Sequence, residues 1–265
     1  LDTPLSEYLN GLTKSERLRR VLAANYPLHG IEPNDCPLFT HFAVTDSYLQ
    51  SAYRVDERKR PMAKAFLFRL RELGVELRRE TEVAEIECDG RSVSGVRLTT
   101  GESIAADVVI YTGHPKELVK RCGALRPVFR NRVLELEDTV GFFTACFSWT
   151  ADACPAASSD VFIYRTLDLD AAPGRWDPAS RDSLGVLYLA ASPCDEKGRY
   201  PLVAIASAYH DEWKAWSETE TGQRGLDYGS RKWGLAEYLL HLIREQYPEF
   251  AESVELIDSN TPLTL

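Results

Sequence analysis

Four aromatic residues near the end of the chain could form the wall of a binding site. Trp213, Trp216, Tyr228 and Trp233 lie within a short stretch of the sequence. Large aromatic side chains are typical of apolar pockets that bind small molecules. They are equally typical of residues that cover the outer face of a sheet, so the sequence leaves both interpretations open.

Motifs for phosphate binding, metal binding and nucleophilic catalysis are missing from the sequence. A GxGxxG dinucleotide site needs glycines two residues apart, so that the backbone can approach a pyrophosphate at a helix start. None of the 16 glycines has another glycine at that distance. No P-loop, HExxH or GxSxG motif is present. The six cysteines are at least eight positions apart, which excludes CxxC spacing for zinc or redox chemistry.

The titratable residues indicate structural roles rather than catalytic ones. Five histidines are scattered along the chain, and a lone histidine is more often a structural residue than a ligand. The adjacent carboxylates Asp211 and Glu212 are better explained as a helix start, where negative charge complements the helix dipole. The sequence therefore assigns no catalytic acid, base or metal ligand.

The composition is that of an ordinary globular protein, with 44% hydrophobic and 27% charged residues among 265. A formal net charge of -9 argues against a nucleic-acid surface. No run approaches the roughly 18 consecutive apolar residues of a membrane span. Because neither a secretory segment nor an Asn-x-Ser/Thr site is found, we expect reduced cysteines and a cytoplasmic protein. The chain starts at Leu1 and its only methionine is Met62, so we expect a piece of a longer protein.

The first half of the sequence predicts helices followed by a small sheet. Helices are expected within the first 50 residues, where Ser15 can cap a helix by accepting an orphan backbone N–H. A further helix begins at Pro61 and ends at Gly74. The next segments predict a strand at 75–78, a meander over 81–106 with turns at Asp89-Gly90 and Thr100-Gly101, and a buried strand at 108–111. We expect the first and last of these strands to be parallel neighbours.

The second half predicts a longer antiparallel sheet and one long helix. A basic helix is expected at 126–136, and the long helix follows Ser230. Strands are expected near 139–149, 160–166, 184–191, 201–209 and 254–257. Together these elements predict an α+β fold. One lobe, 1–55 and 124–265, would contain a mixed, mainly antiparallel sheet with helices, and 56–123 would form a partial parallel-sheet lobe.

The order of segments over residues 61–115 resembles a known family. A helix, the strand GVELR, the segment TEVAEI and the run SGVRLTTGESIAADVVIYTGHP follow one another. This order is similar to the second part of the flavin domain in the phytoene desaturase, carotenoid isomerase and retinol saturase branch of the flavin amine oxidoreductase superfamily. PLSEYL, SAYRVD, YHDEWKAW, YLLHLIREQYPEF and VELIDSNTPLTL agree with it, so the resemblance covers essentially the whole chain.

The resemblance implies that the intact protein is an FAD-dependent oxidoreductase. It would transfer hydride equivalents between FAD and an apolar, isoprenoid or carotenoid-like substrate, whose uptake suggests a peripheral membrane contact. Residues 1–55 and 124–265 would be the substrate-binding lobe, and 56–123 part of the FAD lobe. By position in the motifs, Val83 would contact the adenine end of FAD through its backbone, and Thr112, Gly113 and His114 would lie near the cofactor. The family's GxGxxG strand precedes the matching residues, so we expect this chain to bind FAD weakly or not at all.

An apolar substrate needs an apolar pocket, and alternating residues on the central strands are candidates for its wall. Alternate side chains of an extended strand share one face. We therefore expect six residues to line an elongated cavity: Phe143, Phe147, Leu187, Leu189, Val203 and Ile205. Burial under the long helix at 230–246 is the competing interpretation for the same residues.

One departure from the family pattern leaves other functions open. The family has two adjacent glycines where this sequence has Glu57 and Arg58, whose side chains would crowd a flavin. The first alternative is therefore a non-catalytic binding protein on the same scaffold, similar to Rab GDP-dissociation inhibitors. The second is an amine oxidase of the same superfamily.

Overall fold

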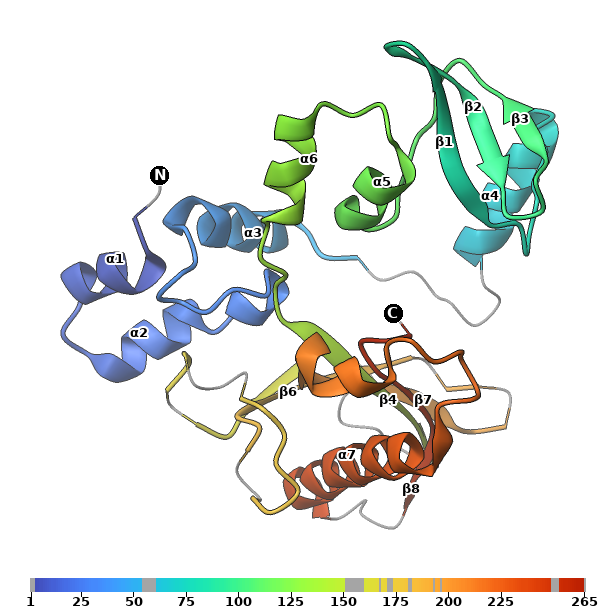
Figure 1. Cartoon of the computed structure of the whole chain (residues 1–265). Coiled ribbons are helices and arrows are strands. Elements are labelled where there is room, and N and C mark those ends of the chain that lie inside the picture. Colours follow the sequence, from blue (N-terminus) through green and yellow to red (C-terminus); the bar gives the residue numbers. More distant parts are fainter. Residues whose placement is uncertain are drawn as a thin grey trace. The chain divides into compact units, whose positions relative to one another are not determined.

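The computed structural model describes most of the chain as two compact units (Figure 1). The described residues are 3–53, 61–150, 160–166, 168–170, 174–180, 183–192, 194–195, 197–248 and 253–264. The first unit comprises residues 1–64 and 139–265, and the second comprises 65–138. Residues 124–138, expected in the substrate-binding lobe, thus fall in the second unit. The fold is α+β, with helices and two antiparallel sheets.

The first unit is built on a five-stranded sheet of order β5-β6-β7-β4-β8. All neighbouring strands in it are antiparallel. The strands lie where the alternating patterns predicted them: β4 (Gly141–Trp149), β5 (Val161–Tyr164), β6 (Val186–Ala191), β7 (Tyr200–Ala208) and β8 (Val254–Asn260). The long helix is also present, as α7 (Gly225–Gln246), and it begins earlier than its apolar stripe indicated.

Helix α7 covers one face of this sheet. Leu235, Leu239 and Ile243 recur every four residues on the helix, so they form one apolar stripe. This stripe is buried against alternate side chains of β4, β6 and β7. The short 3-10 helix η3 (His210–Trp216) carries the carboxylates Asp211 and Glu212 in its first turn, as expected. It adds the buried Trp213 to the same core.

Short helices at the start of the chain pack on the other face. They are α1 (Leu5–Leu12), α2 (Glu16–Ala23), η1 (Tyr26–Leu28) and α3 (Leu38–Gln50). Ser15 caps α2, since its Oγ accepts from the Leu18 N–H at 3.3 Å. A second core joins these helices to β6: Leu5, Leu9, Ala23, Tyr26, Cys36, Leu169 and Val186. Because Val186 and Leu187 point to opposite faces, this core lies on the side that α7 leaves uncovered.

The second unit contains the predicted meander. Its antiparallel strands are β1 (Val83–Asp89), β2 (Ser92–Leu98) and β3 (Ser103–Ala105). Its helices are α5 (Pro115–Arg121), α6 (Pro127–Leu134) and all but the first turn of α4 (Pro61–Glu72). Gly90 and Gly101 occupy the two turns at φ 63° and 89°, and Gly74 follows α4 at φ 68°. These are left-handed conformations that glycine adopts without a steric penalty, so the turn and helix-stop signals in the sequence were correct.

The prediction of neighbouring parallel strands at 75–78 and 108–111 is wrong. Neither segment has strand pairing with any described residue. Both segments instead expose apolar side chains, among them Leu77 at 54% and Ile110 at 86%. A central parallel strand needs a neighbour on each side for its backbone groups and a cover on both faces. The described part of this unit supplies neither.

Candidate functional site

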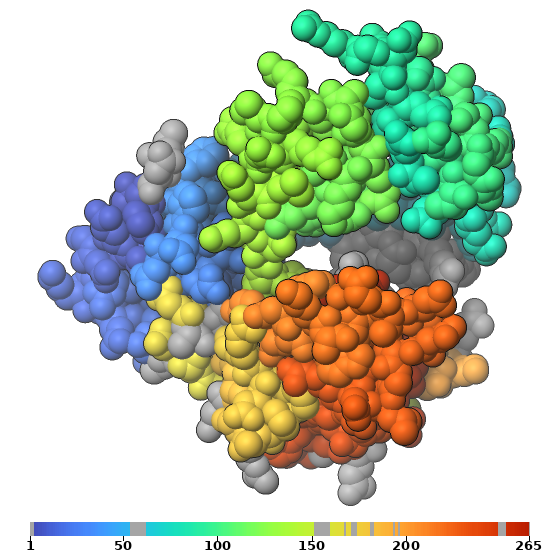
Figure 2. All heavy atoms as spheres, viewed as in Figure 1, coloured from blue at the N-terminus to red at the C-terminus, as the bar shows by residue number. Residues whose placement is uncertain are grey.

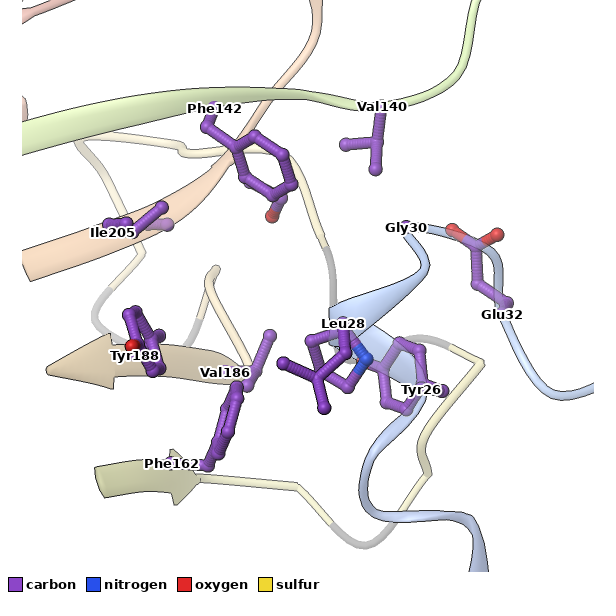
Figure 3. Close-up of a pocket in the computed structure, with 13 residues that line it drawn as sticks. Tyr26, Leu28, Gly30, Glu32, Val140, Phe142, Phe162, Val186, Tyr188 and Ile205 are labelled. Atoms are coloured by element: carbon purple, nitrogen blue, oxygen red, sulfur yellow. The ribbon is translucent and has the colours of Figure 1, made fainter. Parts of the chain in front are cut away.

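An apolar cavity of about 290 Å³ lies in the first unit, on the sheet face opposite α7. One wall is the segment that contains η1, and the floor is formed by strands β4 to β7. Figure 3 shows Tyr188 and Ile205 toward one end and Tyr26, Leu28 and Glu32 toward the other. The described lining residues are Tyr26, Pro27, Leu28, Gly30, Glu32, Val140, Phe142, Phe162, Val186, Tyr188, Ile205, Ala206 and Ser207.

Strand register explains the apolar floor of the cavity. Tyr188 on β6 is the register partner of both Ile205 on β7 and Phe162 on β5. The ring centroids of Phe162 and Tyr188 are 4.8 Å apart. Directly opposite side chains of an antiparallel pair project from the same face of the sheet. Three adjacent strands therefore present one continuous apolar surface to the cavity.

The expectation that six strand residues share one cavity-lining face is wrong. Phe143, Phe147, Leu187 and Leu189 lie in the core beneath α7, as the competing interpretation held. Val203 and Ile205 project from the opposite face, because they alternate with Leu202, Ala204 and Ala206, which belong to that core. Of the six, only Ile205 lines the cavity.

Most of the lining residues were not predicted from the sequence. Phe142 and Tyr188 are immediate neighbours of the predicted residues Phe143 and Leu187 on their strands. The alternation of side chains along each strand would have predicted them if the opposite face of the sheet had been chosen as the cavity wall. Tyr26 and Leu28 gave no comparable signal. They lie more than a hundred positions before the strands that they meet.

The cavity has few polar groups: Glu32 lies at the η1 end, Tyr188 brings a hydroxyl group at the other end (Figure 3), and Ser207 lies on β7. Glu32 is the only charged residue among the described lining residues, and its half-buried side chain makes no hydrogen bond or ion pair with any of the described chain. The Tyr26 ring lines the cavity, but its hydroxyl is buried away from it in the second core and lacks a hydrogen-bond partner among the described residues. Burial, assisted by nearby Tyr164 and Glu32, raises the Tyr26 pKa far above its usual value, so this phenol stays neutral. Ser207 Oγ is already used, donating to the Gly174 carbonyl at 3.4 Å.

A pair of histidines holds the η1 segment against α3. His41 on α3 is buried, and its Nε2 lies 2.9 Å from the carbonyl oxygen of Leu22. Since a carbonyl can only accept, Nε2 carries the proton, and Nδ1 accepts from Nε2 of His29 at 3.4 Å. Burial lowers the pKa of both histidines. Leu28 and Gly30 flank His29 and line the cavity, so the pair supports the cavity wall.

The residues expected near FAD lie in the second unit, around α5. The Val83 carbonyl accepts from Nε of Arg121 at 3.2 Å, near the end of that helix. His114 caps the helix start, where its Nδ1 accepts from the Lys116 N–H at 3.3 Å. Thr112 and Gly113 are exposed just before it. Glu57 and Arg58 lie outside the described residues.

The aromatic residues near the end of the chain form a core cluster instead of the cavity wall. Trp213, Trp216 and Tyr228 contact one another, with ring centroids 5.6 to 6.0 Å apart. They pack with the core beneath α7. Trp233 is 56% exposed. Of the two interpretations of these residues, covering a sheet face is therefore the one that the structure bears out.

Other site types have no support in the described part of the chain. No group of three or more histidine, cysteine or acidic residues there could hold a metal ion. The five described cysteines, Cys36, Cys88, Cys122, Cys146 and Cys194, are free. Among the described helices, none is both long and apolar enough to cross a bilayer.

The chain is similar in sequence to two retinol reductases. No family model matches the chain. The all-trans-retinol 13,14-reductase of Rattus norvegicus is 22% identical over 284 residues, and that of Danio rerio is 20% identical over 281. Each alignment covers 98% of this chain and 46% of the relative. The chain thus spans about half the length of the curated relatives that it matches.

Solved structures share the fold. An oxidoreductase from Methanosarcina mazei matches with a TM-score of 0.69 at 12% identity, covering 97% of this chain and 55% of that one. A protein from Pyrococcus furiosus matches with a TM-score of 0.61 at 12% identity, covering 98% and 57%. In sequence over nearly its whole length, and in fold, the chain is similar to the retinol saturase-like branch of the flavin amine oxidoreductase superfamily.

Proposed function

We propose that this chain forms the substrate-binding part of an oxidoreductase that acts on an apolar, isoprenoid-like substrate. The apolar cavity on the sheet face opposite α7 carries the proposal. Its floor of Phe142, Tyr188 and Ile205 offers hydrocarbon and aromatic surface with few competing polar groups. Burying a ligand there would gain roughly 25 cal/mol per Å² of apolar area removed from water. The retinol reductase relatives and the oxidoreductase from Methanosarcina mazei support the same class of reaction.

FAD is the cofactor that we propose for the intact protein. A bound flavin would accept or supply the hydride equivalent, and this chain's residues would bind and orient the substrate and exclude water. The exposed Thr112, Gly113 and His114 are proposed to border the cofactor, with the Val83 backbone at its adenine end. The sequence contains no GxGxxG turn, so we propose that the larger share of the cofactor site is supplied by residues outside this chain.

A peripheral membrane contact is proposed for substrate uptake by a protein of the cytoplasm. Helix α2 exposes Leu18, Val21 and Leu22 at 46%, 66% and 41%, and these residues are spaced to share one helix face. Phe39 and Phe42 of α3 are also exposed, in the same unit. Such a surface suits insertion at the level of lipid headgroups.

The test of the proposed function is a flavin half-reaction in the full-length protein. Chemically reduced enzyme is mixed without oxygen with an all-trans isoprenoid polyene such as retinol, and flavin reoxidation is followed by absorbance. We expect reoxidation together with formation of the reduced product. A protein that binds the polyene without any flavin redox change would instead be a binding protein on this scaffold.

A further inference from the structure

The second unit brings two free cysteine thiols together, one on β1 and one at the end of α5. Helix α5 packs on β1, where Nε of Arg121 donates to the Val83 carbonyl at 3.2 Å. Figure 1 shows the two elements side by side, and Figure 2 shows the atoms of this unit in teal to light green. Cys88 lies on β1, and Cys122 is the C-cap residue of α5. The two thiol groups are in hydrogen-bonding contact, and neither cysteine is in a disulfide.

Both cysteines lie at the ends of their elements, where a disulfide could form with little rearrangement. A disulfide needs Cβ atoms about 3.5–4.5 Å apart and a defined S–S torsion, so two contacting thiols still have to move closer. Cys88 is one residue before the end of β1, beside the turn at Asp89-Gly90. Cys122 ends α5 and is followed by Gly123. The backbone beside a turn and after a helix can adjust locally without disturbing the rest of either element.

The two thiols differ in exposure, and this difference sets the order in which they react. Cys88 is half-buried and reaches solvent, whereas Cys122 is only 6% exposed. A dissolved oxidant therefore meets Cys88 first, and Cys122 is placed to react with the group that becomes attached there. Burial and the neighbouring Cys122 thiol raise the pKa of Cys88. Since the thiolate is the reactive form, the reaction should be slow at neutral pH and faster as the pH rises.

We propose that Cys88 and Cys122 form a reversible dithiol–disulfide site that reacts with low-molecular-weight disulfides such as oxidised glutathione. The Cys88 thiolate attacks one sulfur of oxidised glutathione, whose S–S bond breaks, and the departing glutathione thiolate takes up a proton. The Cys122 thiolate then attacks the Cys88 sulfur of this mixed disulfide and releases the second glutathione. The two protein thiols together lose two electrons and two protons, and one oxidised glutathione becomes two glutathione thiols.

The disulfide would fasten α5 to β1. In the reduced protein these elements are held together by noncovalent contacts, such as the hydrogen bond from Arg121 to the Val83 carbonyl. A covalent link removes the open states in which α5 leaves β1. Because β1 begins at Val83 and His114 caps the start of α5, the oxidised form would hold together two elements that are proposed to border FAD. The disulfide site itself does not depend on that proposal.

Oxidation of the full chain by oxidised glutathione, without oxygen, tests this site at pH 7 and pH 8. Samples are quenched with acid, the remaining thiols are alkylated, and tryptic peptides are identified by mass spectrometry before and after dithiothreitol. We expect one linked pair of peptides that carries Cys88 and Cys122, formed about tenfold faster at pH 8 than at pH 7. Oxidation should also slow amide hydrogen exchange in α5 several-fold and leave exchange in α7 unchanged.

Variants separate this pair from the other cysteines. Cys194 is also half-buried and free, but its thiol contacts the Asp195 carbonyl oxygen at 3.4 Å, so Cys194→Ser should form the linked pair at an unchanged rate. Cys122→Ala should stop at the mixed disulfide between Cys88 and glutathione. Peptide mapping of the unmodified chain decides the proposal even if Cys122→Ala fails to fold.

The unmodified chain can overturn the proposal in three ways. It would be wrong if excess oxidised glutathione produced no linked pair of Cys88 and Cys122, if the reaction stopped at the mixed disulfide, or if either cysteine became linked to a different one. A linked pair that left hydrogen exchange in α5 unchanged would support the disulfide and overturn its effect on the packing of α5 against β1.

Discussion

Ile205 and Ala204 are adjacent on β7 but project from opposite faces of the sheet. Ile205 is half-buried and lines the apolar cavity, with Tyr188 as its register partner. Ala204 is fully buried beneath α7, with Leu189 as its partner. Substitutions at the two faces of one strand should therefore have different effects, one on ligand binding and the other on stability.

Filling the cavity should abolish ligand binding without unfolding the protein. In Ile205→Trp the larger ring occupies the cavity, so we expect retinol binding by the chain to weaken at least tenfold, with the unfolding midpoint in urea little changed. In Leu187→Trp the ring is forced into the packed core under α7, and we expect a loss of about 1–3 kcal/mol in the free energy of unfolding. If the two variants behaved alike, the assignment of faces would be wrong.

Two buried tyrosines should respond differently to loss of their hydroxyl groups. The Tyr164 hydroxyl donates to the Ala24 carbonyl, whereas the Tyr26 hydroxyl has no partner in the described part of the chain. We expect Tyr164→Phe to lower the free energy of unfolding by about 0.5–1.5 kcal/mol, and Tyr26→Phe to leave it unchanged or raised. Urea denaturation of both variants measures the difference. A larger loss in Tyr26→Phe would show that its hydroxyl is hydrogen-bonded after all.

The histidine pair should make stability depend on pH. Burial lowers the pKa of His29 and His41 in the folded protein below the value of about 6.5 of the unfolded chain. The unfolded chain therefore binds more protons between the two pKa values, and protonation favours unfolding. Stability from this source is complete above pH 6.5 and decreases as the pH falls below it. We expect His41→Gln to reduce this acid sensitivity in thermal unfolding at pH 7.5 and 5.5. The exposed His241 provides a control, since His241→Gln should leave it unchanged.

The chain by itself should purify without stoichiometric flavin. It contains no GxGxxG turn, and the segment expected to border the cofactor is exposed at Thr112 and Gly113. We expect dialysis against FAD to leave little flavin absorbance with the protein. A stoichiometric flavin spectrum would contradict the proposed location of the cofactor site.

The exposed face of α2 should bind lipid. We expect Val21→Glu to reduce several-fold the fraction of the chain that sediments with neutral phosphatidylcholine vesicles, because a charge replaces an apolar contact with the membrane. Leu226→Glu makes the same kind of change at a position on α7 that is 89% exposed, and should have no effect. Equal loss in both variants would indicate nonspecific adsorption.

The sequence by itself determined where most helices and strands lie. Local rules were sufficient for the helix that ends before Gly74, for the meander turns at Gly90 and Gly101, and for the five strands of the first unit. Each of these signals depends on neighbouring residues. The left-handed backbone that a glycine adopts in a turn, and the alternation of side chains along a strand, are set by local geometry. They do not depend on which distant residues the chain packs against.

Only the tertiary structure decided which sheet face is core and which is cavity. The strands β4 and β6 carry apolar residues on both faces, such as Phe142 beside Phe143, so alternation groups residues by face without saying what covers each face. The same limit misled the interpretation of 108–111, where an apolar run indicates burial but Ile110 is exposed. Burial depends on packing partners that are distant in the sequence. Residues 26–32 come more than a hundred positions before β4, and their contact with the sheet creates the cavity.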